Sequence, residues 1–341
     1  MNTSTPSTIR LTSPDEIICA VPMLVGFHPT DSLVVLVLGD GAGAGVRLTA
    51  RMDVAPLLEP GALVVALRDL LARVPGVSGV ILVAFCEDPP GVLARCAGQA
   101  VHPAVPLVDL ITTDGRRWWA LGCRAAGCEG AHRLVDSSRV RAELVVAGLA
   151  ALPDRATVER RYAGPASPSP RQVEAVRREV AGWDADRVRS RCLDLVDGGG
   201  GPPGDAPTTA AWQVDEPLEL AVLVSDPEVA RWLWWQTPTE RARQWHQRWT
   251  DVVAAAPDEV ALAPLVMCGL TAWLCGEGAA HVVCLERLDR FGDGAPLGDL
   301  VTAVRAIHDR VVPPQCWQGI AACRDLALAS LAGPVGVVGG P

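Results

Sequence analysis

An uninterrupted apolar run over residues 32–38 constrains the fold of this chain more than any other segment. A strand with one face in water alternates apolar and polar residues, whereas this run has no polar residue after Ser32. A strand of this kind is buried on both faces of its sheet. We therefore predict a layered α/β (or α+β) domain in the N-terminal part of the chain.

The neighbouring segments supply more elements for this domain. Residues 46–54 alternate in polarity after a glycine-rich turn, which predicts a hairpin with the first run. Helical spacing over residues 61–74 and an apolar run over residues 77–85 add a β-α-β pattern. Residues 107–112 and 117–121 flank an Asp-Gly pair, which is typical of a tight hairpin. We expect about five strands.

Helix signals mark both ends of this domain. Ser13, Pro14 and Glu16 have the pattern of a capping box, which predicts a helix over residues 14–25 that ends at Gly26. Residues 137–152 predict a further helix. Three prolines within residues 164–170 then interrupt the pattern and favour a domain boundary.

The remaining segments predict helices. One long helix over residues 171–196 and a Gly/Pro-rich loop come first, and five or six helices joined as antiparallel hairpins follow. One of these covers an uncharged stretch, residues 260–276, which we interpret as a buried helix. The predicted organisation is an α/β domain (1–163), a long helix with a linker (164–212), an all-helical domain (213–320) and a tail (321–341).

Composition excludes several classes of chemistry. The net charge is −9, and all 30 basic residues are arginine. The negative charge makes nucleic acids and membranes poor partners, and the lack of lysine excludes Schiff-base chemistry and a Walker A loop. The glycines between residues 39 and 45 open no helix, so we predict no phosphate loop and no cofactor. A polar start without a secretory signal predicts a cytoplasmic protein with reduced cysteines.

Several segments resemble a known family. They are Ser13-Pro14-Asp15-Glu16, Val21-Pro22-Met23-Leu24-Val25-Gly26-Phe27-His28-Pro29, Asp31-Ser32-Leu33-Val34-Val35, Arg51-Met52-Asp53, Gly115-Arg116-Arg117-Trp118-Trp119, Trp273 with Gly276-Glu277-Gly278-Ala279-Ala280, and Val312-Pro313-Pro314-Gln315-Cys316-Trp317. The chain resembles, over about residues 13–317, the actinobacterial family catalogued as domain of unknown function 4192. The resemblance implies no activity. The loop after Cys128 departs from the family, which has a further cysteine and a Pro-Gly pair there.

One candidate site lies where the first apolar run begins. It comprises His28, Asp31, Ser32, Arg51 and Asp53. A histidine beside a carboxylate and a hydroxyl has the groups needed for acid-base or nucleophilic chemistry. The same side chains suit a loop that bonds its own backbone, and the spacing matches no nucleophile motif, so we favour the structural interpretation.

Cysteine and histidine form two further clusters. Cys123, Cys128 and His132 could supply three ligands of a zinc site, although no second cysteine pair completes the site. Alternatively, Cys123 and Cys128 could form a disulfide. Cys268, Cys275, His281 and Cys284 share the faces of adjacent predicted helices. We interpret both sets mainly as structural residues and predict no metal.

The helical part also carries a tryptophan- and arginine-rich segment. Trp232, Trp234 and Trp235 cannot all face one core, because successive helical positions turn by about 100°. We therefore expect Trp234 to be the most exposed of the three and to bind a partner together with Arg231 and Arg241.

Two functions follow as hypotheses. The one we favour is a non-catalytic binding or regulatory protein whose helical domain recruits a protein partner or a second copy. The alternative is a small-molecule enzyme that uses the set around His28.

Overall fold

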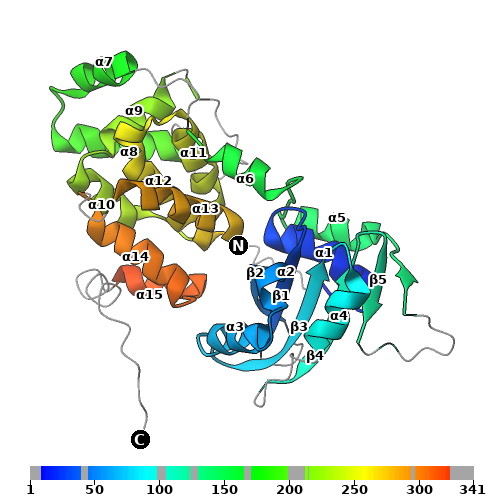
Figure 1. Cartoon of the computed structure of the whole chain (residues 1–341). Helices are drawn as coiled ribbons and strands as arrows, with labels where there is room; N and C mark the ends of the chain where they lie inside the picture. The colour runs from blue at the N-terminus through cyan, green and yellow to red at the C-terminus, as the bar shows by residue number, and fades with distance from the viewer. Residues whose placement is uncertain are drawn as a thin grey trace, which may run out of the picture. The chain divides into compact units, whose positions relative to one another are not determined.

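The computed structural model describes residues 9–39, 45–97, 105–121, 123, 130–164, 170–198, 212–213, 215–292 and 296–322. Internal contacts divide the chain into two compact units, Met1–Arg155 and Ala156–Pro341. The first unit is built around a sheet and the second is helical (Figure 1). The predicted order of an α/β domain followed by a helical one is confirmed.

The sheet of the first unit has the strand order β2-β1-β3-β4-β5-β6. Its strands are β1 (Ser32–Gly39), β2 (Val46–Asp53), β3 (Val77–Phe85), β4 (Leu107–Thr113), β5 (Arg117–Ala120) and β6 (His132–Arg133). Both predicted hairpins form, because β1 pairs antiparallel with β2 and β4 with β5. One described strand, β6, was not predicted. It has two residues and is too short to show a periodic pattern.

The central strand β1 is buried along its whole length, as its apolar run predicted. Leu33, Val35 and Val37 join a core with α2 (Val54–Leu57), α3 (Ala62–Leu71) and α4 (Pro89–Ala97). β3 pairs antiparallel with β1 and parallel with β4, so α4 provides a parallel crossover. In the predicted β-α-β unit of β2, α3 and β3, the two strands are not adjacent. β1 lies between them in the sheet.

The first helix forms as its capping signals predicted. In α1 (Pro14–Val25) the Glu16 N–H donates to Ser13 Oγ at 3.3 Å. Gly26, with φ 91°, ends the helix, and its N–H donates to the Pro22 carbonyl. α1 packs against α5 (Ser138–Val146). α5 is shorter than the predicted 137–152 helix because the chain leaves the helical conformation at Gly148, where φ is 81°.

From residue 155 onward the described chain is helical. The α-helices are α6 (Arg155–Arg161), α7 (Pro170–Val180), α8 (Ala185–Asp197), α9 (Glu216–Leu223), α10 (Pro227–Gln236), α11 (Ala242–Ala255), α12 (Asp258–Leu274), α13 (Gly278–Leu288), α14 (Gly298–Asp309) and α15 (Trp317–Ala322), with short 3-10 turns at Asp289–Phe291 and Pro314–Cys316. The single long helix predicted over residues 171–196 is wrong. The helix is interrupted between α7 and α8. Asp184 caps α8, because its carboxylate accepts from the Arg187 N–H at 2.8 Å.

Helix α12 is the centre of the second unit. Its residues from Val260 onward are almost all buried, and it contacts α9, α10, α11, α13 and α14. The buried helix predicted over residues 260–276 is therefore confirmed. Over the described ranges, no helix combines the length and the apolar character needed to cross a membrane.

Candidate functional site

The candidate set at the start of β1 assembles only in part. The buried Ser32 hydroxyl donates to the Thr30 carbonyl at 2.6 Å and accepts from Arg51 Nε at 2.9 Å. Arg51 also forms an ion pair with Asp53, with 2.6 Å between Nη2 and Oδ1. Within the described residues, no hydrogen bond joins the side chains of His28 or Asp31 to these three. Since its hydrogen bonds hold the strand end, Ser32 fits a structural role, and the acid-base hypothesis stays a prediction.

The second predicted cluster contains one close pair. Cys123 Sγ and His132 Nε2 are 3.0 Å apart at the β5–β6 edge of the sheet. Cys128, the third residue of the predicted zinc or disulfide set, lies outside the described residues. Of this set, the described residues thus place a thiol next to an imidazole.

The tryptophan prediction is wrong in its main point. Trp234 is fully buried and meets Trp317 of α15 edge to face at 5.7 Å, whereas Trp232 and Trp235 are half-buried. The prediction assumed a single core-facing side of α10, but α8 and α12 both contact this helix and α15 adds Trp317. The expected reason for a partner site at Trp234 is thereby removed.

The two arginines of the same predicted surface are paired within the chain. Arg231 forms a bidentate pair with Asp299, with Nε to Oδ2 at 2.8 Å and Nη2 to Oδ1 at 3.1 Å. Arg241 Nη1 lies 2.9 Å from Asp197 Oδ1. Their guanidinium groups are thus engaged by carboxylates of the same unit.

The third cysteine and histidine set separates into different environments. The His281 ring is buried, its Nδ1 lies 2.8 Å from the Gly269 carbonyl, and burial lowers its pKa to about 4. His281 is therefore a neutral donor to the backbone. Cys268 and Cys284 are buried, and burial raises the pKa of Cys268 well above its usual value. Cys268 lies 3.8 Å from Nδ1 of His246, and Cys275 lies close to the same histidine and to Glu277, so both reach a second ionisable cluster.

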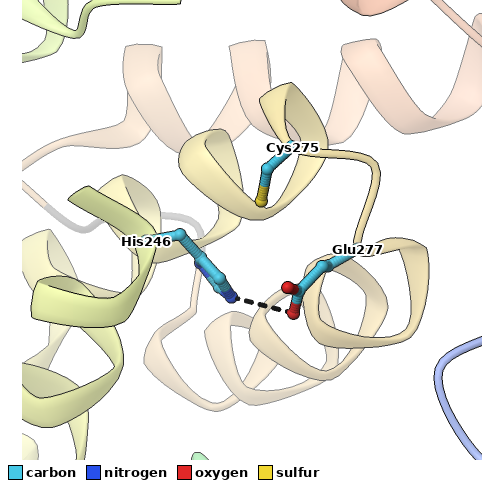
Figure 2. Close-up of side chains that lie close together, drawn as sticks. All are labelled: His246, Cys275 and Glu277. Carbon is cyan, nitrogen blue, oxygen red and sulfur yellow. Dashed lines mark ion pairs between the residues drawn. The ribbon is translucent and has the colours of Figure 1, made fainter. Parts of the chain in front are cut away.

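That cluster joins His246, Cys275 and Glu277 (Figure 2). His246 comes from α11, Cys275 follows the end of α12, and Glu277 precedes α13. One potential ligand atom from each lies within 4.8 Å of the other two. His246 Nε2 is 3.3 Å from Glu277 Oε2. Three helices therefore converge on a nitrogen, a sulfur and an oxygen.

A tight turn places Cys275 and Glu277 next to each other. Gly276 between them has φ 79°, a left-handed conformation that suits glycine. The Glu277 N–H donates to the Ala272 carbonyl at 2.8 Å, and the Gly276 N–H donates to the Trp273 carbonyl at 3.1 Å. This is the hydrogen-bond pattern of a Schellman motif, which ends α12 and turns the Glu277 side chain back toward α11.

Thr271 contacts the His246 nitrogen that does not face Glu277. The Thr271 hydroxyl donates to the Met267 carbonyl at 2.9 Å, so its oxygen offers a lone pair to His246 Nδ1 at 3.4 Å. Nδ1 therefore carries hydrogen, and Nε2 is the nitrogen that faces Glu277. The Tyr162 hydroxyl lies 3.1 Å from the same Nε2. An imidazole held in this way presents Nε2 in a fixed direction.

The charges of the cluster are coupled. Burial lowers the pKa of His246, but Cys268 and Glu277 oppose this effect and raise it overall to about 9. The hydrogen bond to His246 lowers the pKa of Glu277 against the effect of burial, and Arg243 adds to the lowering. Burial raises the pKa of Cys275 to about 12. Without a bound cation, the cluster is thus an imidazolium-carboxylate pair beside a neutral thiol.

The same three groups suit a divalent transition metal. Zinc binds imidazole nitrogen, thiolate sulfur and carboxylate oxygen, at about 2.0–2.3 Å and in a tetrahedral arrangement. Two light ligands at those distances are roughly 3.3 Å apart by geometry, which matches the separation of His246 Nε2 and Glu277 Oε2. Glu277, with a side chain 35% exposed, leaves a route from solvent. One metal position would remain open to water or to the Tyr162 hydroxyl.

Sequence reasoning missed most of this cluster. His246 and Tyr162 were not singled out, and Glu277 appeared only in the segment that carries the family resemblance. The contributing residues come from separate helices at irregular spacing, so no motif of fixed length links them. The one local signal is the Cys-Gly-Glu-Gly segment, whose last three residues contributed only to the family resemblance.

Comparison with known proteins identifies a family. No curated protein and no solved structure is significantly similar to the chain. The model of a domain of unknown function (DUF4192) matches residues 14–314, which include β1, the cluster around His246 and nearly all of the described chain. The predicted resemblance is thereby confirmed at the level of the family. The chain belongs to this family of domains of unknown function.

Proposed function

We propose that this protein is a non-catalytic binding protein whose helical unit holds a zinc-class divalent metal ion at His246, Cys275 and Glu277. The observation that carries the proposal is the convergence of one nitrogen, one sulfur and one oxygen ligand atom within 4.8 Å. The sequence alone predicted no metal and no cofactor. The proposal departs from that prediction because the ligands come together only in the fold.

The donor set favours zinc over harder cations. Magnesium and calcium prefer shells made of oxygen alone, whereas a thiolate with an imidazole selects zinc and related transition metals. Binding requires the Cys275 thiol to lose its proton, which the metal charge promotes. It also requires reduced cysteines, and the proposal therefore places the protein in a reducing compartment such as the cytoplasm.

A bound metal would replace the two ion pairs of Glu277 by a stronger link among three helices. Arg243 Nη1 lies 3.3 Å from Glu277 Oε1, and His246 pairs with the other carboxylate oxygen. Metal at Glu277 would compete with both contacts and would tie the α12–α13 turn to α11. We include a protein partner in the proposal, because helical arrays are common scaffolds for protein recognition. No surface is assigned to that partner, since Trp234 is buried.

The test is metal titration of the full chain after chelator treatment. We expect one equivalent of zinc to bind, and cobalt in its place to give the visible absorption of a tetrahedral thiolate site. The substitutions Cys275→Ser and Glu277→Gln should each weaken zinc binding at least about tenfold. Cys123→Ser and Cys316→Ser are matched controls that should leave the affinity unchanged. Equal zinc affinity in the wild type and in both cluster variants would exclude this site.

A further inference from the structure

We propose that Cys123 is a histidine-activated thiol that forms mixed disulfides with low-molecular-weight disulfides. Its sulfur lies 3.0 Å from His132 Nε2, and Cys123 is half-buried. An imidazole at this distance can accept the thiol proton and leave a thiolate beside an imidazolium. The proposal is independent of the metal site, because the two lie in different units.

The histidine ring is held in position by its neighbours. His132 stacks on Trp118 with ring centroids 4.2 Å apart and planes 20° apart. The two residues are paired across β5 and β6. Trp118 is itself fixed, because its Nε1–H donates to Asp15 Oδ1 at 3.0 Å, and the Val135 N–H donates to the same oxygen at 2.8 Å. These contacts orient Nε2 toward Cys123 before any reagent arrives.

The setting of several other cysteines explains why Cys123 is distinguished. Burial raises the pKa of Cys86, Cys192 and Cys275 to about 12, and it also raises the pKa of Cys19 and Cys96. Thiols of this kind stay protonated near neutral pH and react slowly. Cys123, by contrast, has a base within hydrogen-bond distance.

The chemical step is a thiol-disulfide exchange. His132 takes the proton of Cys123, and the resulting thiolate attacks one sulfur of the small disulfide. A new bond forms between Cys123 Sγ and that sulfur, while the original S–S bond breaks. The departing thiolate takes the proton back from His132, so no electrons are gained or lost overall. Excess thiol reverses the reaction by the same route.

The experiment uses reduced full-length chain in the presence of a chelator, with dithiodipyridine as the disulfide. Release of the thione gives the rate, and mass spectrometry of peptides assigns each modified cysteine. We expect Cys123 to react at least about tenfold faster than the exposed Cys316 at neutral pH. Cys123→Ser should remove the fast phase. His132→Gln should slow Cys123 about tenfold at neutral pH and leave Cys316 unchanged.

A measurement on the unaltered protein covers the case in which His132→Gln disturbs the sheet edge. The rate of an unassisted thiol falls about tenfold for each pH unit below its pKa of ~8.5. A histidine-paired thiol stays reactive to lower pH, so the Cys123 rate should fall much less than that of free cysteine between pH 8 and pH 6. A Cys123 rate that follows free cysteine, or that is equal in the wild type and His132→Gln, would overturn the proposal.

Discussion

The two units each place a cysteine near a histidine, but in opposite surroundings. In the helical unit His246 is buried, Thr271 accepts from its Nδ1, and a carboxylate faces its Nε2. At the sheet edge His132 Nε2 faces a thiol, and its ring is supported by an indole. The first imidazole therefore pairs with a carboxylate, whereas the second lies next to a thiol. Partners and burial, more than residue type, set the chemistry.

The two units should also differ in how far a substitution affects stability. Groups around His246 lie in the packed core of α11, α12 and α13, so changes there should affect the whole helical unit. His132, by contrast, lies at the β5–β6 edge of the sheet and is only half-buried, so changes at this residue should stay more local. Hydrogen exchange can follow α12 and β1 separately and thereby report on each unit.

The largest effect is expected for Trp234→Ala in the core of the helical unit. Its side chain is fully buried against Trp235 and Trp317, so its removal should cost about 3–5 kcal/mol of unfolding free energy. Chemical denaturation followed by exchange of α12 measures this loss. Trp232→Ala, at a half-buried position under Arg189, is the control and should cost about 1 kcal/mol. Equal losses in the two variants would contradict the expected difference between a fully buried and a half-buried tryptophan.

The histidines themselves provide the next test. His246→Ala removes a buried ring and leaves the Tyr162 hydroxyl without this partner, so it should cost about 2–4 kcal/mol. His132→Ala should cost about 1 kcal/mol or less, because the ring is only half-buried at a sheet edge. Denaturation of both variants under the same buffer conditions measures the two costs. If His132→Ala lost more unfolding free energy than His246→Ala, the sheet-edge histidine would be the more important one for stability, which contradicts this expectation.

The pH dependence of the metal-free helical unit should have a defined sign. The pKa of His246 is raised to about 9 in the folded protein. Its contribution to the free energy of unfolding is therefore complete below the unfolded pKa of about 6.5 and is lost as pH rises through 9. The amount is on the order of 3 kcal/mol. The lowered pKa of Glu277 adds stability that disappears as pH falls below the ordinary glutamate value. Denaturation at several pH values with chelator should show the alkaline loss in the wild type and a flatter profile in His246→Gln.

Thr271→Val tests the orientation of His246 for metal binding. The substitution keeps the shape of the side chain and removes the oxygen that faces Nδ1. Loss of such a supporting group lowers metal affinity about 10–100-fold in comparable sites. Zinc titration measures the effect, and Thr302→Val on α14 is the control because its hydroxyl bonds to the Gly298 carbonyl away from the cluster. An unchanged zinc affinity in Thr271→Val would show that Thr271 does not orient the ligand.

The smallest effect concerns the turn that presents Cys275 and Glu277. Gly276→Ala should cost about 1 kcal/mol, because φ is 79° although open space surrounds the added carbon. Gly278→Ala is the control, since this glycine also has open space and begins α13 without a positive φ. Thermal denaturation should therefore place Gly276→Ala below the wild type and Gly278→Ala close to it or above it. A stable Gly276→Ala would indicate that the turn can relax.

Much of the fold was predictable where the signal is local. The apolar run identified β1 as a buried strand, and Ser13, Pro14 and Gly26 located both ends of α1. The break before Asp184 was missed, because helical periodicity continued across it and outweighed a single capping residue. The exposure of Trp234 was predicted wrongly, since the covering Trp317 lies far away along the chain.

Most strands, the ends of α1 and the division into a sheet-based half and a helical half could be read from the sequence, because each depends on residues within a few positions of one another. The meeting of His246, Cys275 and Glu277, and the contact of Cys123 with His132, became visible only in the folded chain. Such encounters depend on the packing of helices and strands that are distant in the chain. The charge state and direction of a side chain follow from those neighbours, so they become readable only once the core is built.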